Sequence, residues 1–165
     1  MFPIYLSVLK TAFKEIRKFN CKEKQMLVTT GNHYLAYVLE PHARDNLLVW
    51  HGEHMRRHIV IVCHHITIAY DFTPEQLPIL QEFVNTNPVF TTDKYLLGDG
   101  IDCFTVKANS KADRPLGGKF HLTAARSISR SNRESNDLIS GIIPTFNTIG
   151  AFMYLKGSFQ LIPKR

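Results

Sequence analysis

Two stretches of the chain repeat one arrangement of side chains that is suited to acid–base chemistry. His65 is followed two places later by Thr67 within the β-branched run 59–70, and His121 is followed in the same way by Thr123. Because strand side chains alternate between faces, a histidine and a threonine two places apart project from one face, about 7 Å apart. Two such pairs facing each other would form a metal-free site for a phosphate ester.

Sequence context strengthens the signal of these two motifs. Two His-x-Thr copies are only mildly surprising in a chain with eight histidines, but both lie in expected strands with apolar residues between and after the pair. Register selects His65 over its neighbour His64, because only His65 has the threonine on its own face. A strand histidine is more often a hydrogen-bonded core residue, so that interpretation stays open beside the catalytic one.

With these motifs the chain resembles the two-histidine (2H) phosphoesterase superfamily, the LigT-like phosphodiesterases. The hallmark of that family is two His-hydrophobic-Thr/Ser-hydrophobic motifs on facing strands of a two-lobed fold. The resemblance covers most of 34–163, including a strand expected at 34–39 and a segment rich in Ser and Asn at 131–136. Residues 1–30 lie outside it. His64 departs from it, because the family usually has an apolar or small residue there.

The resemblance implies roles for the four motif residues. His65 and His121 would act as general acid and general base, in an order that the near-symmetric motifs leave open, while Thr67 and Thr123 would hydrogen-bond the phosphate oxygens. An ordinary imidazole pKa of about 6.5 lets one neutral and one protonated ring coexist near neutral pH. Each proton transfer would contribute roughly 10²–10⁴-fold. The hydroxyls would stabilise the developing charge without a metal or other cofactor.

The resemblance also implies a function, that of a metal-independent phosphodiesterase acting next to a ribose 2′-position. Substrates in the family include 2′,3′-cyclic phosphates at RNA ends, 2′-5′ oligoadenylates and cyclic oligonucleotide messengers of antiviral defence. Viral members erase the last two. The sequence ranks none of these substrates above the others. The alternative function is a module of the same fold that binds RNA or a nucleotide without catalysis.

Aromatic and basic side chains supply candidates for contacting the substrate. Basic residues near the second motif would attract a polyanion, and aromatic residues would stack on a base. Scattered surface lysines and core aromatics are the competing interpretation. The substrate-binding candidates are Tyr37, Tyr70, Lys119, Arg126 and Tyr154, and Lys107, Lys111 and Arg114 are further basic residues around the second motif.

A histidine-rich stretch at 51–58 raises the question of a metal site. It lacks the HExxH spacing of zinc hydrolases and is expected to be a loop, so no metal is assigned to it. The preferred interpretation is a solvated loop that lines the substrate site. A metal-dependent hydrolase built on this loop is a third functional hypothesis.

The elements that would position these residues suggest an α+β fold of two pseudo-symmetric lobes. Antiparallel sheets would line a central cleft, with helices on the outside. Helices are expected over 7–19, 41–50, 73–84 and 131–140, the third begun by the capping pair Thr73 and Gln76. Strands are expected at 34–39, 59–70, 89–97, 101–108 and 120–124, with two more around a turn at 156–158.

The chain as a whole suits one domain, because 165 residues can bury a sizeable core. Residues 1–30 would form an N-terminal helical extension of a core at 31–165. A net charge of +6 favours nucleotides and RNA as partners. Three cysteines without CxxC spacing indicate a reducing compartment. With no signal-peptide pattern and no stretch near the ~20 apolar residues that span a bilayer, we expect a cytoplasmic protein, in a cell or an infected host, and a monomer.

Overall fold

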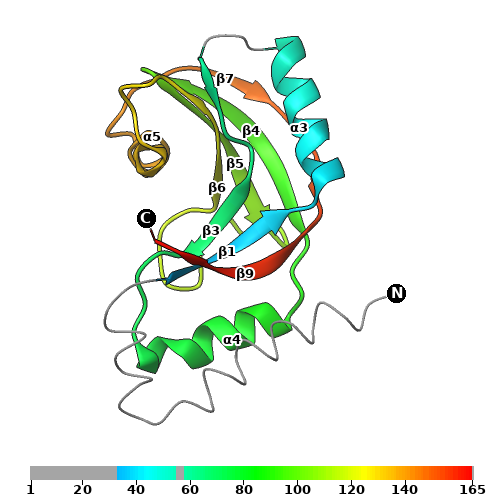
Figure 1. Ribbon diagram of the computed structural model, residues 1–165, viewed down its shortest axis with the longest axis vertical. Helices are drawn as coiled ribbons and strands as arrows, with labels where there is room; N and C mark the ends of the chain where they lie inside the picture. The colour runs from blue at the N-terminus through cyan, green and yellow to red at the C-terminus, as the bar shows by residue number, and fades with distance from the viewer. Residues whose placement is uncertain (1–32, 55–57, 165) are drawn as a thin grey trace.

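A computed structural model describes residues 33–54 and 58–164 (Figure 1). The helix predicted over 7–19 lies outside the described residues. The helices are α3 (Pro41–His54), α4 (Leu77–Asn85) and α5 (Ser135–Ser140), with 3-10 turns η1 (Pro74–Gln76) and η2 (Asn132–Glu134). The strands are β1 (His33–Leu39), β2 (Val60–Ile61), β3 (His65–Ala69), β4 (Phe90–Gly98), β5 (Ile101–Ala108), β6 (His121–Arg126), β7 (Thr145–Gly150), β8 (Tyr154–Leu155) and β9 (Gly157–Pro163).

The described strands form two sheets in which the neighbours run antiparallel. In the three-stranded sheet β1 lies between β3 and β9, and the six-stranded sheet has the order β2-β6-β5-β4-β7, with β8 also paired to β4. Figure 1 shows α3 and α5 on opposite sides of the sheets and α4 beyond the three-stranded sheet. The fold is therefore α+β with antiparallel sheets, as the sequence predicts.

The run 59–70, predicted as one central strand, is two strands in different sheets. β2 pairs with β6 in the six-stranded sheet, whereas β3 pairs with β1 in the three-stranded sheet. Between them the chain turns at Cys63, whose φ of +39° is uncommon for a residue with a side chain. We call this turn, residues 62–64, the fork. An uninterrupted β-branched run gives no sign of such a turn, which explains the wrong prediction.

One hydrophobic core joins the two sheets. Ile66 and Ile68 of β3 and Leu122 and Ala124 of β6 belong to the same buried cluster. These residues alternate along their strands with the four His-x-Thr residues, so the histidines and threonines project from the faces turned away from this core. A second, smaller cluster lies where α5 covers the outer face of the six-stranded sheet, and comprises Ile101, Cys103, Leu138 and Ile143.

The ends of several elements test the predicted boundaries. The Thr73 N–H donates to the Gln76 side chain at 2.9 Å, which confirms this capping pair. The expected loop at 51–54 is wrong, because α3 continues through His54. The expected turn at 156–158 is also wrong, because Gly157 and Ser158 pair with β1 as part of β9. A Cβ at Gly157 would clash with the β1 backbone, so this glycine serves a close strand approach and not a turn.

Candidate active site

The fork brings the two His-x-Thr motifs to neighbouring positions. Where the chain leaves the six-stranded sheet, the Cys63 N–H donates to the Thr123 carbonyl oxygen at 3.0 Å and so continues the antiparallel β2–β6 ladder. The chain then leaves this ladder at the fork, and β3, which begins at His65, contacts β6, which begins at His121. The two histidines, far apart in the sequence, are therefore the first residues of two strands that contact each other where the sheets diverge.

Both imidazoles are held neutral at pH 7 in the free protein. The pKa of His65 is lowered to about 4, first by burial and then by the charges of His64 and His121. Burial also lowers the pKa of His121 to about 4, with the Arg114 charge adding to the effect and a hydrogen bond to the Lys119 carbonyl opposing it. The mixed protonation expected from ordinary pKa values therefore does not hold in the free protein. The effect of His121 on His65 means that the two rings are within electrostatic reach.

Both ring nitrogens of His65 have a neighbour. His65 Nδ1 lies 3.0 Å from Nδ1 of His64, and His65 Nε2 lies 3.3 Å from the hydroxyl of Tyr34 on β1. Since only one of two facing imidazole nitrogens carries the proton, the His64 contact constrains the tautomer of His65. His64, which departs from the family pattern, thus touches the predicted catalytic histidine directly.

His121 is held by its own strand. Its Nδ1 lies 3.1 Å from the Lys119 carbonyl oxygen, which can only accept, so Nδ1 carries the proton and donates it. In the neutral ring this leaves Nε2 as the basic nitrogen. The residue is only 7% exposed, which accounts for the strong effect of burial on its pKa.

The two threonines have different surroundings. The Thr123 hydroxyl lies 2.7 Å from the hydroxyl of Ser135 on α5 and 3.4 Å from the Asn132 carbonyl oxygen. Among the described residues the half-buried Thr67 makes no side-chain hydrogen bond. The Thr67 hydroxyl is therefore available to donate a hydrogen bond to a substrate. The Thr123 hydroxyl, in contrast, also links β6 to the segment 131–136.

A group of aromatic and cationic side chains continues the site away from His65. The Tyr34 ring lies 5.6 Å from the His65 ring and 5.4 Å from that of Tyr70. The Arg133 guanidinium donates to the Tyr70 hydroxyl and lies 4.6 Å from the ring centre, while the Lys164 ammonium lies 4.4 Å from it. Arg133 in η2 thus joins the segment after the second motif to the end of the first motif's strand.

The structure does not bring the other substrate-binding candidates to the histidines. Tyr37 lies on the core face of β1, against Phe90 and Phe159 at ring distances of 4.4 and 5.1 Å. Tyr154 is exposed on β8, which pairs with β4, two strands away from β6. Aromatic residue type alone could not separate Tyr70, beside the site, from these two, because the separation depends on the strand face.

The two basic candidates have structural partners. Lys119 forms an exposed ion pair with Asp113 at 2.5 Å, and its carbonyl oxygen, not its ammonium group, contacts His121. The Arg126 guanidinium donates to the Asn132 side chain at 2.8 Å and to the Arg130 carbonyl oxygen at 2.7 Å. Arg126 therefore stabilises the loop after β6.

Sequence reasoning missed Tyr34 and Arg133 as site residues, and placed Arg114 only in a general basic group. Tyr34 lies in the predicted strand at 34–39, but its place beside His65 depends on the β1–β3 pairing. Arg133 lies in the Ser- and Asn-rich segment, which was a usable signal because the family resemblance already marked it. Nothing in the local sequence indicates that Arg114 approaches His121.

The histidine-rich stretch contributes to a second polar cluster. His58 Nε2 lies 3.4 Å from Asp102, whose fully buried carboxylate also accepts from the Tyr95 hydroxyl and the Gly98 N–H, each at 3.2 Å. His51 is buried, and burial lowers its pKa. Among residues 33–54 and 58–164, no group of His, Cys, Asp or Glu is arranged to hold a metal ion. The cluster therefore gives no support to a metal-dependent hydrolase.

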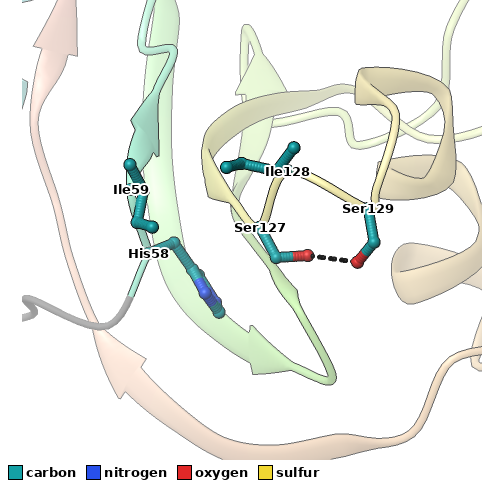
Figure 2. Close-up of a pocket in the computed structure, with 5 residues that line it drawn as sticks. All are labelled: His58, Ile59, Ser127, Ile128 and Ser129. Atoms are coloured by element: carbon teal, nitrogen blue, oxygen red, sulfur yellow. Dashed lines mark hydrogen bonds between the residues drawn. The ribbon is translucent and has the colours of Figure 1, made fainter.

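A pocket of about 460 Å³ lies beside this second cluster (Figure 2). Its lining comprises His58, Ile59, Ser127, Ile128 and Ser129, and the two serine hydroxyls are 3.0 Å apart. The pocket is next to the end of β6 at Arg126, whereas His121 begins that strand. It contains none of the four His-x-Thr residues and none of the five substrate-binding candidates, and is separate from the histidine pair.

Comparison of the chain with family models, with curated proteins and with solved structures finds no match. The likeness to the 2H phosphoesterases therefore stays a prediction from the two motifs. No helix in the described part of the chain is long and apolar enough to cross a membrane.

Proposed function

We propose that this protein is a metal-independent phosphodiesterase of the 2H type, in which His65 and His121 exchange protons with the substrate. One observation carries the proposal: two histidines from matching motifs begin strands that contact each other at the fork, and the charge of one lowers the pKa of the other. The three-stranded and six-stranded sheets would be the two lobes of the 2H fold, with its cleft at the fork. The cytoplasm is the setting that we propose for this reaction.

The proposed reaction uses the two rings in opposite senses. His121 Nε2 takes the proton from a water molecule or a ribose 2′-hydroxyl as its oxygen forms the new bond to phosphorus. The bond from phosphorus to the leaving oxygen breaks, and protonated His65 gives its proton to that oxygen. Thr67 donates to a phosphoryl oxygen. A bound phosphodiester, being anionic, raises the pKa of nearby imidazoles and so helps one ring to be protonated in the complex.

The assignment of base and acid rests on the different surroundings of the rings. His121 donates through Nδ1, which leaves Nε2 as an uncommitted base. The charge of His64 destabilises protonated His65, so that a protonated His65 readily gives up its proton. A substrate with a 4-nitrophenolate leaving group needs no acid. We therefore expect it to restore activity to His65→Ala and not to His121→Ala, and the reverse pattern would exchange the two roles.

A substrate panel tests the function itself. Purified protein would be incubated in EDTA with 2′,3′-cyclic nucleotides, linear 2′-5′ and 3′-5′ oligonucleotides and cyclic dinucleotides, and the products separated by chromatography. We expect turnover of at least one substrate that has a ribose 2′-linkage or 2′-hydroxyl. His65→Ala and His121→Ala should each lower kcat by roughly 10²-fold or more. His42→Ala, which alters an exposed histidine on α3, serves as the control.

The outcomes separate this proposal from its alternatives. Binding of a nucleotide without turnover would favour the non-catalytic RNA or nucleotide module. Activity that EDTA abolishes would favour a metal-dependent hydrolase. Near-normal turnover by either variant, His65→Ala or His121→Ala, would show that the proton-transfer roles are wrong.

A further inference from the structure

Arg114 lies in a tight loop that leads directly into the second motif. The loop closes on itself, because the Arg114 N–H donates to the Gly118 carbonyl oxygen at 2.9 Å and the Phe120 N–H donates to the Ala112 carbonyl oxygen at 2.8 Å. His121 follows at once as the first residue of β6. The backbone of Arg114 is therefore fixed relative to the predicted catalytic histidine.

The Arg114 guanidinium is oriented by two contacts and retains unused donors. Its Nε donates to the Gly117 carbonyl oxygen at 3.2 Å, and its Nη2 lies 3.5 Å from the Asn136 side-chain oxygen. A guanidinium has five N–H groups, so these contacts leave Nη1 without a partner in the part of the chain that the structure describes. No carboxylate among those residues forms an ion pair with Arg114. Within the described residues its charge therefore has no ion-pair partner, although burial lowers its pKa.

Gly118 makes room for this guanidinium. A Cβ built at Gly118 would clash with Arg114 Nη2 and lie 3.1 Å from its Cζ and Nε. The neighbouring Gly117 has a comparable positive φ, +98° against +79°, but a Cβ there would meet no atom within 4 Å. Both glycines allow a positive φ. Only at Gly118 does the missing side chain also leave the space that the Arg114 guanidinium occupies.

Arg114 and the second motif converge on two consecutive residues of α5. Asn136 contacts the Arg114 guanidinium, and the preceding Ser135 contacts the Thr123 hydroxyl at 2.7 Å. The charge of Arg114 also lowers the pKa of His121. A cation that forms no ion pair with any described residue thus lies beside a histidine and a threonine that project from the same face of β6.

We propose that Arg114 binds the phosphate of the substrate beside His121, and that Gly118 holds it in position for this contact. The inference rests on the proposed function for its substrate class, a phosphodiester. A guanidinium suits this task, because its planar pair of N–H groups matches two phosphate oxygens. The competing role for Arg114 is purely structural, as a link between the loop and α5.

Inorganic phosphate provides a test that does not depend on turnover. Its dissociation constant would be measured at pH 7 from the NMR shifts of the His121 ring during titration of the full chain. Charge-assisted contacts of this kind correspond to roughly tenfold to hundredfold in affinity, so Arg114→Ala should weaken phosphate binding by about that factor. Lys111→Ala removes one positive charge from the same loop at an exposed position, and should weaken binding much less.

The two glycines provide a matched pair that keeps Arg114 itself. Gly117→Ala and Gly118→Ala both place a side chain at positive φ, so both should lower thermal stability. Only Gly118→Ala should displace the guanidinium and weaken phosphate binding about tenfold or more. Equal phosphate affinity of Gly118→Ala and Gly117→Ala, or wild-type affinity of folded Arg114→Ala, would overturn the proposal. If phosphate binding depends on Arg114 but no phosphodiester is cleaved, the anion site stands and the enzymatic function fails.

Discussion

Acidification should destabilise this protein through His121, and the effect can be calculated from its burial. The folded state holds the pKa of His121 at about 4, whereas an unfolded chain has a value near 6.5. Between these two pH values the unfolded chain binds a proton that the folded protein does not bind. Lowering the pH through this window therefore favours unfolding.

The difference between the two pKa values sets the size of the effect. Below pH 4 this difference lowers the free energy of unfolding by about 3 kcal/mol through His121 alone. At pH 5 the loss is about 2 kcal/mol. Asparagine does not titrate, and its side-chain amide can donate to the Lys119 carbonyl oxygen in place of Nδ1. His121→Asn should therefore remove this part of the pH dependence while keeping that hydrogen bond.

Urea unfolding at pH 8 and at pH 5 gives the required free energies. The loss of stability between these pH values should be about 2 kcal/mol smaller in His121→Asn than in the wild type. His42→Asn, on the exposed surface of α3, should lose as much as the wild type. If His121→Asn loses stability on acidification as steeply as the wild type, His121 does not resist protonation in the folded state and the reasoning from burial is refuted.

Further measurements probe the neighbouring groups. His64→Ala should raise the pKa of His65 in an NMR titration, because it removes a charge that lowers this pKa; an unchanged or lower value would contradict the contact. For an active substrate, kcat/KM should be highest below pH 6.5, because both rings resist protonation in the free protein, and a maximum above pH 7 would argue against the proposed pair. Asp102→Ala should destabilise the protein by about 2–3 kcal/mol in urea, since it removes the buried acceptor of the Tyr95 hydroxyl, with kcat per folded molecule retained. A large loss of kcat there would link the second cluster to the site.

Local patterns in the sequence were sufficient for most elements of the fold. Alternating apolar residues predicted β4 and β5 within one or two residues, and the capping pair Thr73 and Gln76 marked the start of the turn that leads into α4. The same alternation assigned the His-x-Thr side chains to one face of each strand. These features depend on residues close together in the chain, so the sequence alone determines them.

The arrangement of the candidate site was decided by contacts between distant segments. The turn at Cys63 sends β3 into another sheet although its residue types are those of one continuous strand. The β1–β3 pairing places Tyr34 beside His65 while Tyr37, three residues on, faces the core. The lowered pKa values likewise come from burial by remote residues. The two-residue alternation of a strand predicts the face from which a side chain projects. Only tertiary packing determines which residues lie opposite that face and how far water reaches it.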